Sequence, residues 1–338
     1  MPTPSTPSGA TPSDRPSPEP HGPHESHEPR LTVGIISAGA VGTALAEAFS
    51  RAGHHVHGVN VHSERSAVAA SKRILTIPQL PLDQVAQAAL VILAVPDPQL
   101  PTVIEEVAQH TQDGQMVAHT SGAFGCDILQ PITDTGALPL ALHPAMAFTG
   151  SPVDTERLTG CAWGITADSD QGLAVAELLV TTVAGVPIAI AEDKRPAYHA
   201  AMAHAGNHTV TLINDALRIM DYVLDGTSAA GTAGATGAHT PGAQVPHNPD
   251  SAMLLRRLAL AAVDNALESR MDQLTGPVAR DDAPAVLRHI AALEELSDGS
   301  AGSASFTAAY TTMAERTAQM RHAIEVERVL ADKTMGLR

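Results

Sequence analysis

Hydrophobic and polar positions alternate along the first half of the chain in a pattern that predicts strands separated by helices. Short apolar runs, each bounded by glycine, proline or polar residues, indicate strands that are buried in a sheet. The predicted strands are 31–36, 55–61, 89–95, 115–119, 138–142, 161–166 and 187–190. Helical periodicity separates several of them, and the predicted helices are 41–52, 99–110, 125–135 and 170–184. This alternation favours a mostly parallel, doubly wound α/β sheet.

After residue 193 the strand signals stop and only helical periodicity remains. The segments that carry it are 195–224, 251–274, 283–296 and 304–330. We therefore expect an α/β domain over residues 31–192 and an all-helical C-terminal domain over residues 193–332.

Two segments are too poor in large apolar residues to contribute to a core. Residues 1–30 are mainly Pro, Ser, Thr, His and Glu, so we expect a disordered tail. Residues 225–250 are rich in Gly, Ala and Thr and predict a flexible loop inserted between two helices. The tail histidines at 21, 24 and 27 are evenly spaced, but without a fold to fix their geometry we expect no metal site.

Composition excludes several classes of partner. The formal net charge of −16 over 338 residues argues against nucleic acid and anionic membranes, because both require clustered basic residues. No apolar run reaches the roughly 18–20 residues of a membrane span, and we expect no secretory signal at the N-terminus. Cys126 and Cys161 lack metal-ligand spacing, so we expect reduced thiols and a cytoplasmic protein.

Residues 31–46 carry the most informative motif, an apolar strand followed by a glycine-containing turn and an alanine-rich helix. A dinucleotide-binding fingerprint requires this context. Gly39 would let the backbone approach a pyrophosphate, and Gly42 would let the helix pack closely on the strand, while the helix N-terminus offers free N–H groups. Ser37 replaces the first glycine of G-x-G-x-x-G, and a serine fits this turn if its φ is negative. The candidate cofactor residues here are Ser37, Ala38, Gly39, Ala40, Val41 and Gly42. The alternative is an ordinary βα turn that binds no nucleotide.

The end of the second predicted strand bears on the choice between NAD and NADP. No carboxylate stands at the strand tip, where it would bond the ribose 2′-hydroxyl of NAD. Ser63 and Arg65 offer a hydroxyl and a guanidinium that suit a 2′-phosphate, whereas Glu64 competes as a ribose ligand. Arg65 could also simply begin a solvated helix. We expect NADP, with NAD as the alternative.

Polar residues follow three of the predicted strands, at the sheet edge where ligands of α/β proteins lie. The residues expected beside the nicotinamide ribose are Val95, Pro96 and Asp97. Ser121 and the Gly122 N–H are candidates to bind a substrate oxygen, and the same pair would serve as a helix N-cap. His143 is a candidate proton donor or hydrogen-bond partner, and the alternative is a buried histidine bonded to backbone.

The predicted helix 195–224 carries polar residues on an Ala-, Met- and Leu-rich surface. His199 and Asn207 lie eight residues apart, so they face within about 80° of each other. They are candidates to bind the substrate, or else they form interhelical hydrogen bonds.

Arg280 ends the segment that follows the predicted helix 251–274. A guanidinium binds a carboxylate bidentately, so Arg280 is a candidate anchor for an acidic substrate. Pairing with the neighbouring Asp281 and Asp282 is the alternative.

Several separated motifs, taken in order, resemble one family. They are the fingerprint, Ala94-Val95-Pro96-Asp97, His119-Thr120-Ser121-Gly122-Ala123, Ala141-Leu142-His143-Pro144, Tyr198-His199-Ala200-Ala201 with Asn207, and Leu274-Thr275-Gly276-Pro277-Val278-Ala279-Arg280. Over residues 31–330 the chain resembles Rossmann-like oxidoreductases that carry the domain of unknown function 2520 at their C-terminus. More distantly it resembles ketopantoate reductase, pyrroline-5-carboxylate reductase and the 6-phosphogluconate dehydrogenase-like superfamily. The resemblance implies a Rossmann NAD(P) domain, a helical domain of the 6-phosphogluconate dehydrogenase type, a site in the cleft between them, and homodimers formed through the helical domains.

These relatives commonly use a lysine and an asparagine one helical turn apart to hold and protonate the substrate oxygen. Asn207 matches the asparagine, but Ala203 stands where the lysine would be. His199 or His143 would then replace the lysine, or the chain is not a reductase.

The residues and the resemblance together predict an NAD(P)-dependent oxidoreductase that transfers hydride to or from a small carbonyl or imine, with a 2-oxo acid such as ketopantoate as the leading substrate. The predicted catalytic residues are His199, Asn207, Ser121 and His143, and the predicted substrate-binding residues are Gly122 and Arg280. One alternative is a non-catalytic NADP-binding sensor or scaffold. Another is a hydrolase or isomerase that uses the cleft without hydride transfer.

Overall fold

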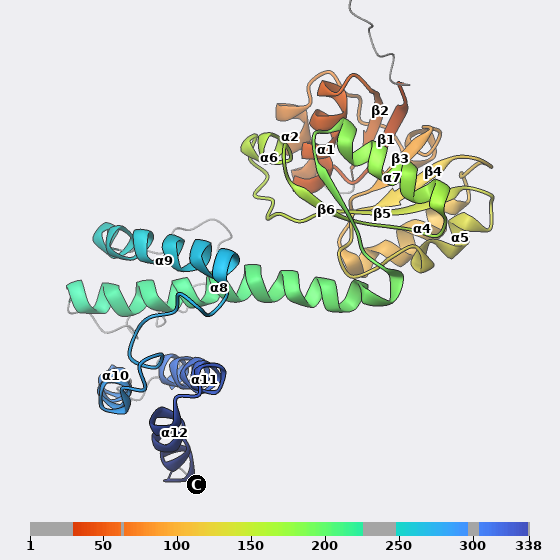
Figure 1. Ribbon diagram of the computed structural model, residues 1–338. Helices are drawn as coiled ribbons and strands as arrows, with labels where there is room; N and C mark the ends of the chain where they lie inside the picture. The colour runs from red at the N-terminus through yellow and green to blue at the C-terminus, as the bar shows by residue number, and fades with distance from the viewer. Residues whose placement is uncertain (1–29, 62–63, 226–247, 297–303, 337–338) are drawn as a thin grey trace, which may run out of the picture. The chain divides into compact units, whose positions relative to one another are not determined.

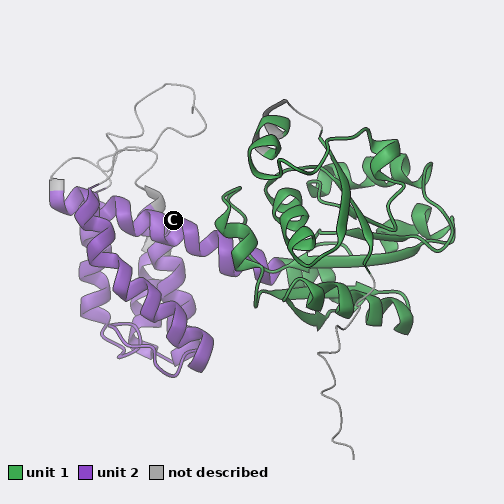
Figure 2. Cartoon of the chain, turned by 90° about the horizontal axis from the view of Figure 1, so that it is seen from above, with its two compact units in different colours: residues 1–199 green, residues 200–338 purple. Residues whose placement is uncertain are grey.

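The computed structural model describes residues 30–61, 64–225, 248–296 and 304–336. The predicted N-terminal tail and most of the predicted insert at 225–250 therefore lie outside the described residues. The chain divides into two compact units, residues 1–199 and residues 200–338 (Figure 2). The first unit holds the sheet (Figure 1), and the second consists of helices in its described part.

The sheet has seven strands within the described residues, in the order β2-β1-β3-β4-β5-β6-β7. The strands are β1 (Thr32–Ile36), β2 (His55–Asn60), β3 (Leu90–Leu93), β4 (Met116–His119), β5 (Leu138–Pro144), β6 (Ala162–Ala167) and β7 (Val186–Ala189). Strands β1 to β5 run parallel, whereas β6 is antiparallel to β5, so the predicted mostly parallel α/β fold is confirmed. The order turns back at β1, which lies between β2 and β3. This is the switch point where ligands of such sheets bind.

Helices cover both faces of the sheet in the first unit. They are α1 (Ala40–Arg51), α2 (Glu64–Arg73), α3 (Leu82–Val85), α4 (Leu100–Ala108), α5 (Gln130–Thr133), α6 (Val153–Arg157) and α7 (Asp170–Thr182). Short 3-10 turns are η1 (Asp97–Gln99), η2 (Asp127–Leu129) and η3 (Glu192–Lys194). Helices α1 and α7 lie on one face, and α4 and α5 lie on the other (Figure 1).

The alternation of side chains along the strands explains the two layers of core. In β3, Leu90 and Ile92 pack in the cluster under α1 and α7, whereas Val91 and Leu93 pack in the cluster under α4. Successive side chains of a strand point to opposite faces, so a continuous apolar run fills both clusters. This burial on both sides fixes the register of β3 and holds its carboxyl end in place.

The second unit is helical in its described part. Helix α8 (Arg195–Asp225) begins in the first unit and continues into the second. The others are α9 (Pro249–Ser269), α10 (Ala283–Glu295), α11 (Ala304–Arg321) and α12 (Ile324–Gly336). Helices α10, α11 and α12 share an apolar core that includes Val286, Ile290 and Val326.

Three details differ from the sequence-based expectations. The helix expected at 125–135 is only the short η2 and α5, and the helix expected at 251–274 ends at Ser269. The helical segment expected at 304–330 is interrupted at His322, whose φ of 56° is left-handed and cannot continue a helix. Among the described residues, no helix combines the length and the apolarity needed to cross a membrane.

Candidate functional site

The β1–α1 turn keeps the shape of a dinucleotide-binding loop although its first glycine is replaced. The expectation that Ser37 would have a negative φ is wrong, because its φ is 79°. This is the left-handed region that favours glycine, so the serine occupies a strained position. The amides of Ser37 and Ala38 both donate to the Asn60 carbonyl at the end of β2, at 3.0 and 3.1 Å. These two bonds hold the turn in its tight conformation.

The two glycines of the turn have different surroundings. A Cβ at Gly42 would lie 1.9 Å from the Ser37 carbonyl oxygen, so only glycine lets α1 pack this closely. A Cβ at Gly39 would meet only the Ser37 Oγ, at 3.8 Å. The open side of the turn is therefore at Gly39, the N-cap of α1, where no side chain caps the helix. Such a helix N-terminus, with an approachable backbone, fits a pyrophosphate.

The end of β3 lies directly beside this turn. Ile36 of β1 is paired with Leu93 of β3, and the Ala94 amide donates to the Ile36 carbonyl at 3.0 Å. The expected cofactor segment Val95-Pro96-Asp97 follows at once, with Val95 buried and Asp97 half-buried. Ser63 and the side chain of Arg65 lie outside the described residues, so the preference for NADP stays a prediction.

The loop after β4 is held by a buried histidine. His119 is fully buried, and its Nδ1 accepts the Ser121 amide at 3.2 Å. Its Nε2 therefore carries the hydrogen and donates to the Gly125 carbonyl at 2.7 Å. Burial lowers the pKa of His119 from 6.5 to about 4, which keeps it neutral. The His119 ring thus fixes the position of Ser121 and Gly122.

Ser121 does not cap a helix, so that interpretation is wrong. The next helical turn, η2, begins at Asp127 with Cys126 as its N-cap. The Ser121 Oγ instead accepts the Ala123 amide at 3.1 Å within the loop. Its side chain is buried at the carboxyl end of β4. Because the oxygen accepts in this bond, the hydroxyl hydrogen is left for another acceptor.

His143 and His199 meet at Gly122, and Tyr198 contacts His143. The His143 Nδ1 and the Tyr198 hydroxyl are 2.7 Å apart, and the His143 and His199 ring centroids are 6.5 Å apart. A Cβ at Gly122 would lie 3.0 Å from the His143 Nε2 and 3.1 Å from the His199 Cδ2. Glycine at this position therefore lets the β4 loop come close to both rings. Four residues from the ends of β4 and β5 and the start of α8 form one cluster.

Burial sets the protonation of this cluster. Burial lowers the pKa of His143 to about 4, with the Arg195 charge acting in the same direction, so the imidazole is neutral near pH 7. Burial raises the pKa of Tyr198, although the Arg195 charge opposes that shift, so the phenol keeps its proton. A neutral imidazole and a neutral phenol are able to share and pass on a proton.

Arg195 lies beneath the cluster with only 1% of its surface exposed. Its Nε donates to the Thr166 Oγ1 at 2.7 Å, and its Nη2 donates to the carbonyls of Ala141 and Gly164 at 3.2 and 3.1 Å. The guanidinium carbon is 5.7 Å from the centre of the Tyr198 ring. Its Nη1 has no hydrogen-bond partner among the described residues. The buried cation therefore ties β5, β6 and α8 together under the histidines.

Two of the predicted site residues belong to the second unit. Asn207 is exposed on α8, and Arg280 is exposed in the segment between α9 and α10. Arg280 does not pair with its neighbours: the Asp281 carboxylate accepts two amides of α12, and Asp282 caps α10. Local charge pairing is therefore not the role of Arg280 in the described chain. Its role as a substrate anchor and that of Asn207 stay predictions.

The list of candidate residues drawn from the sequence missed one member of the cluster, Tyr198, and two residues that support it, His119 and Arg195. Tyr198 stands beside His199 in the sequence, and its aromatic ring is one of few in the chain, with aromatics at 2%. His119 ends a buried strand as His143 does, so its position was a usable signal. Arg195 gave none, because an arginine next to a proline at a helix start normally indicates solvent exposure.

The described residues contain no group of three or more metal-ligating side chains. Cys126 is buried and Cys161 is half-buried, and neither forms a disulfide. Burial raises the pKa of Cys126 to about 12, so its thiol is protonated. No thiolate chemistry is available from this side chain.

Two domain families match the sequence. A Rossmann-like domain matches residues 17–144, and the domain of unknown function DUF2520 matches residues 161–317. The chain joins a Rossmann-like domain to a DUF2520 domain. The family resemblance drawn from the separated motifs is therefore confirmed. No curated protein sequence matches the chain.

Several solved structures share this fold. A candidate NADP oxidoreductase from Bacteroides fragilis matches with a TM-score of 0.64 at 17% identity, over 85% of this chain and 98% of that one. The protein TM1727 from Thermotoga maritima matches with a TM-score of 0.55 at 21% identity, over 88% and 100%. A reductive aminase from Aspergillus terreus, in complex with NADPH4, cyclohexanone and allyl amine, matches with a TM-score of 0.55 at 14% identity, over 90% and 99%. At these identities the likeness establishes the fold.

Proposed function

We propose that this chain is an NAD(P)-dependent oxidoreductase, with NADP preferred, that transfers hydride to or from the carbon of a small carbonyl or imine. The observation that supports it most is the neutral His143–Tyr198 pair at the same sheet edge as the β1–α1 turn. The structurally similar NADP oxidoreductase and reductase chains agree with this choice at the level of fold. The identity of the substrate rests on analogy alone.

The residues of the β1–α1 turn fit a nicotinamide dinucleotide. The amides from Gly39 to Gly42 would bind the pyrophosphate, and residues 95–97 would lie beside the nicotinamide ribose. Ser63 and Arg65 would bind the 2′-phosphate of NADP. When bound, the cofactor supplies the hydride donor or acceptor.

His143 would act on the substrate oxygen. With the Tyr198 hydroxyl donating to its Nδ1, the neutral ring carries its hydrogen on Nε2, the atom beside Gly122. During reduction the Nε2–H passes its proton to the substrate oxygen or nitrogen, and Nδ1 takes the proton of Tyr198. Burial raises the pKa of Tyr198, and the Arg195 charge partly opposes this shift, so the buried guanidinium favours the resulting phenolate. Solvent then returns a proton to the phenol.

The other predicted residues would position the substrate. His199 lies beside Gly122 together with the His143 Nε2, and the Ser121 hydroxyl and the Gly122 amide would bind the substrate oxygen from the same loop. Asn207 would hold the substrate oxygen, and Arg280 would bind a carboxylate. A carboxylate anchor favours a 2-oxo acid of the ketopantoate type as substrate.

A non-catalytic NADP-binding sensor or scaffold is the second candidate. Ala203, in place of the lysine of distant relatives, and the strained Ser37 favour it. The buried His143–Tyr198 pair favours catalysis, because a sensor needs no proton relay beside the bound nicotinamide.

We also propose that the protein is a cytoplasmic homodimer formed through α9. From residue 261 to residue 268 every side chain of α9 is exposed, although the helix is rich in Leu and Ala. Met253, Leu260 and Leu267 recur at seven-residue spacing and are 71%, 59% and 81% exposed. Arg257 and Asp264 lie between them on the same face. Antiparallel pairing of two copies would bury the apolar residues and set Arg257 against Asp264 of the other copy.

The direct test of the function is NADPH oxidation, followed by absorbance, with a panel of 2-oxo acids, aldehydes and imines. We expect turnover of at least one substrate, and we expect its loss in Gly122→Ala, which puts a methyl group 3.0 Å from the His143 Nε2. Tight NADPH binding without turnover of any substrate would support the sensor. Cofactor-independent conversion of a substrate would support a hydrolase or isomerase.

A further inference from the structure

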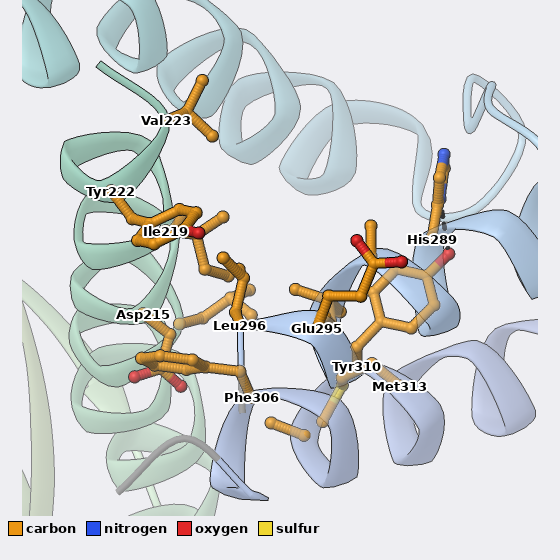
Figure 3. A pocket seen from close by; sticks show the side chains of 15 residues that line it. Asp215, Ile219, Tyr222, Val223, His289, Glu295, Leu296, Phe306, Tyr310 and Met313 are labelled. Carbon is orange, nitrogen blue, oxygen red and sulfur yellow. Dashed lines mark hydrogen bonds between the residues drawn. The ribbon is translucent and has the colours of Figure 1, made fainter. Parts of the chain in front are cut away.

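The second unit contains a cavity that the proposed oxidoreductase function does not use. The cavity measures about 560 Å³ and lies between α8, α10 and α11, with all its lining residues between positions 212 and 313 (Figure 3). This volume falls within the range of about 300–1,000 Å³ that is typical of small-molecule sites. The substrate residues proposed above do not line it.

Most of the cavity wall is apolar and aromatic. Ile219 and Tyr222 come from α8, Leu296 follows α10, and Phe306 and Tyr310 come from α11 (Figure 3). Phe306 is only 2% exposed, so this part of the wall is fixed by packing. The Tyr310 hydroxyl and the His289 Nδ1 are 2.8 Å apart at one end of the cavity. A rigid apolar wall of this kind suits a rigid apolar or aromatic molecule.

The charged side chains of the wall have one sign. Asp215 and Glu295 line the cavity, and none of its fifteen lining residues is a lysine or an arginine. Asp215 is half-buried on α8, and Glu295 ends α10 on the other side of Leu296 (Figure 3). Neither carboxylate forms an ion pair among the described residues. The Arg218 guanidinium is not part of the lining, although it lies 4.7 Å from the centre of the Phe306 ring. The lining itself therefore favours a cation over an anion.

We propose that this cavity binds a small apolar molecule that carries a protonated amine. The apolar body contacts Ile219, Phe306 and Tyr310, and the amine pairs with a carboxylate of the wall, Asp215 or Glu295. The hydroxyl of Tyr310 and the imidazole of His289 supply further hydrogen-bonding atoms. The site is separate from the dinucleotide turn, so it does not depend on the oxidoreductase function.

Fluorescence titration of the full chain with three pyrene probes tests the proposal. Pyrenemethylamine, pyrenemethanol and pyrenecarboxylate share one apolar body and differ in charge. We expect the amine to bind saturably and about tenfold more tightly than the carboxylate, because the two carboxylates of the wall attract the ammonium and repel the carboxylate. The isosteric pair Asp215→Asn and Glu295→Gln together should remove most of this preference while the alcohol binds as before.

Two tryptophan variants locate the binding. Ala216→Trp fills the cavity and should weaken amine binding at least about tenfold. Ala331→Trp, at an exposed position of α12 outside the cavity, is the matched control and should bind like the wild type. Circular dichroism and thermal unfolding check that each variant is folded, and NADPH affinity should be unchanged in both.

Several results would overturn the proposal. Equal affinity for the three probes would do so, as would an amine affinity that is unchanged in Ala216→Trp. The absence of saturable amine binding, because another segment or molecule covers the cavity, would do so too. Dissociation of a dimer by Ala216→Trp in sedimentation would show instead that the cavity lies between two copies. None of these results would bear on NADPH turnover.

Discussion

The two units depart from ordinary globular packing in opposite ways. In the first unit, titratable side chains are buried: His119 and Arg195 are almost fully covered, and His143 is half-buried. In the second unit, large apolar side chains are exposed, among them Met253 and Leu267 of α9. Buried polar groups and exposed apolar groups are the informative exceptions in a folded chain, because each costs free energy unless something compensates.

The compensation also differs between the units. Most polar atoms of the buried groups of the first unit form hydrogen bonds within that unit, although the Arg195 Nη1 has no partner among the described residues. The chemistry of the cluster can therefore be derived from its own contacts. The exposed surface of α9 has no such compensation within the described chain, and it therefore points to something outside the chain. The contacts within the first unit explain its buried groups, whereas the exposed apolar surface of α9 requires a partner. The predictions below test that division, beginning with the largest effect.

Replacing His143 should give the largest change. His143→Gln keeps a hydrogen-bonding side chain but cannot relay a proton, so kcat should fall by about 10²–10⁴ with NADPH affinity unchanged. Tyr198→Phe removes only the relay partner and should cost less. Stopped-flow measurement of NADPH oxidation with the best substrate checks both. A loss of NADPH affinity as large as the loss of kcat, in either variant, would show that the pair holds the structure and does not act on the substrate.

The pH dependence of stability should follow His119 and His143, whose pKa values are both lowered by burial, and His119→Gln should remove only the share of His119. The pKa of His119 is about 4 in the folded chain against an ordinary value of 6.5, so the unfolded chain binds more protons between these values. The contribution of His119 to the free energy of unfolding is then fully present above about pH 6.5. It falls by on the order of 3 kcal/mol as the pH drops to about 4. Urea unfolding between pH 4 and pH 7 measures this, and His119→Gln should make the curve less steep while the contribution of His143 remains. A wild-type stability that does not change over this range would contradict the buried, neutral ring.

The two glycines of the β1–α1 turn should respond differently to alanine. Gly42→Ala places a Cβ 1.9 Å from the Ser37 carbonyl oxygen, and relief of this clash should cost about 1–3 kcal/mol of unfolding free energy. Gly39→Ala meets nothing closer than 3.8 Å and should change stability by less than about 0.5 kcal/mol. Chemical denaturation of both variants checks the difference. Similar losses at both positions would show that the turn is crowded on its ligand side too.

The smallest effect is expected at the exposed face of α9. Arg257→Asp should weaken dimerisation several-fold by setting like charges together, and Asp264→Arg should do the same. The double variant should recover the wild-type dimer, which sedimentation velocity over a range of concentrations would detect. Monomers at every concentration of the wild type, or a double variant no better than either single one, would argue against antiparallel pairing through α9.

The fold was predictable because it depends on local and repeated signals. The apolar run at β3 and the glycines at 39 and 42 indicate a buried strand and a tight βα turn, whatever lies elsewhere in the chain. The antiparallel β6 was not predictable, because strand direction depends on how the chain returns to the sheet and not on the strand's own residues. The left-handed Ser37 was missed for a related reason: the backbone follows the packing of α1, which overrides the preference of a single residue.

The candidate site was predictable in part. His143 and Gly122 were found because they follow strands, and position relative to the sheet edge can be read from the sequence. The contact of His143 with Tyr198 and the support from Arg195 depend on tertiary packing between β5, β6 and α8, which no local pattern encodes. The lowering of the pKa of His143 likewise follows from burial, which the spacing of residues along the sequence does not reveal.

Calorimetric titration of the full chain with NADPH tests the central claim most directly, namely that the β1–α1 turn binds a nicotinamide dinucleotide. We predict saturable binding of one NADPH per chain that is weakened at least about tenfold in Gly39→Val, a variant that keeps the fold but fills the open side of the turn. Absence of binding for both NADPH and NADH at millimolar concentration, or equal affinity in Gly39→Val, would contradict it.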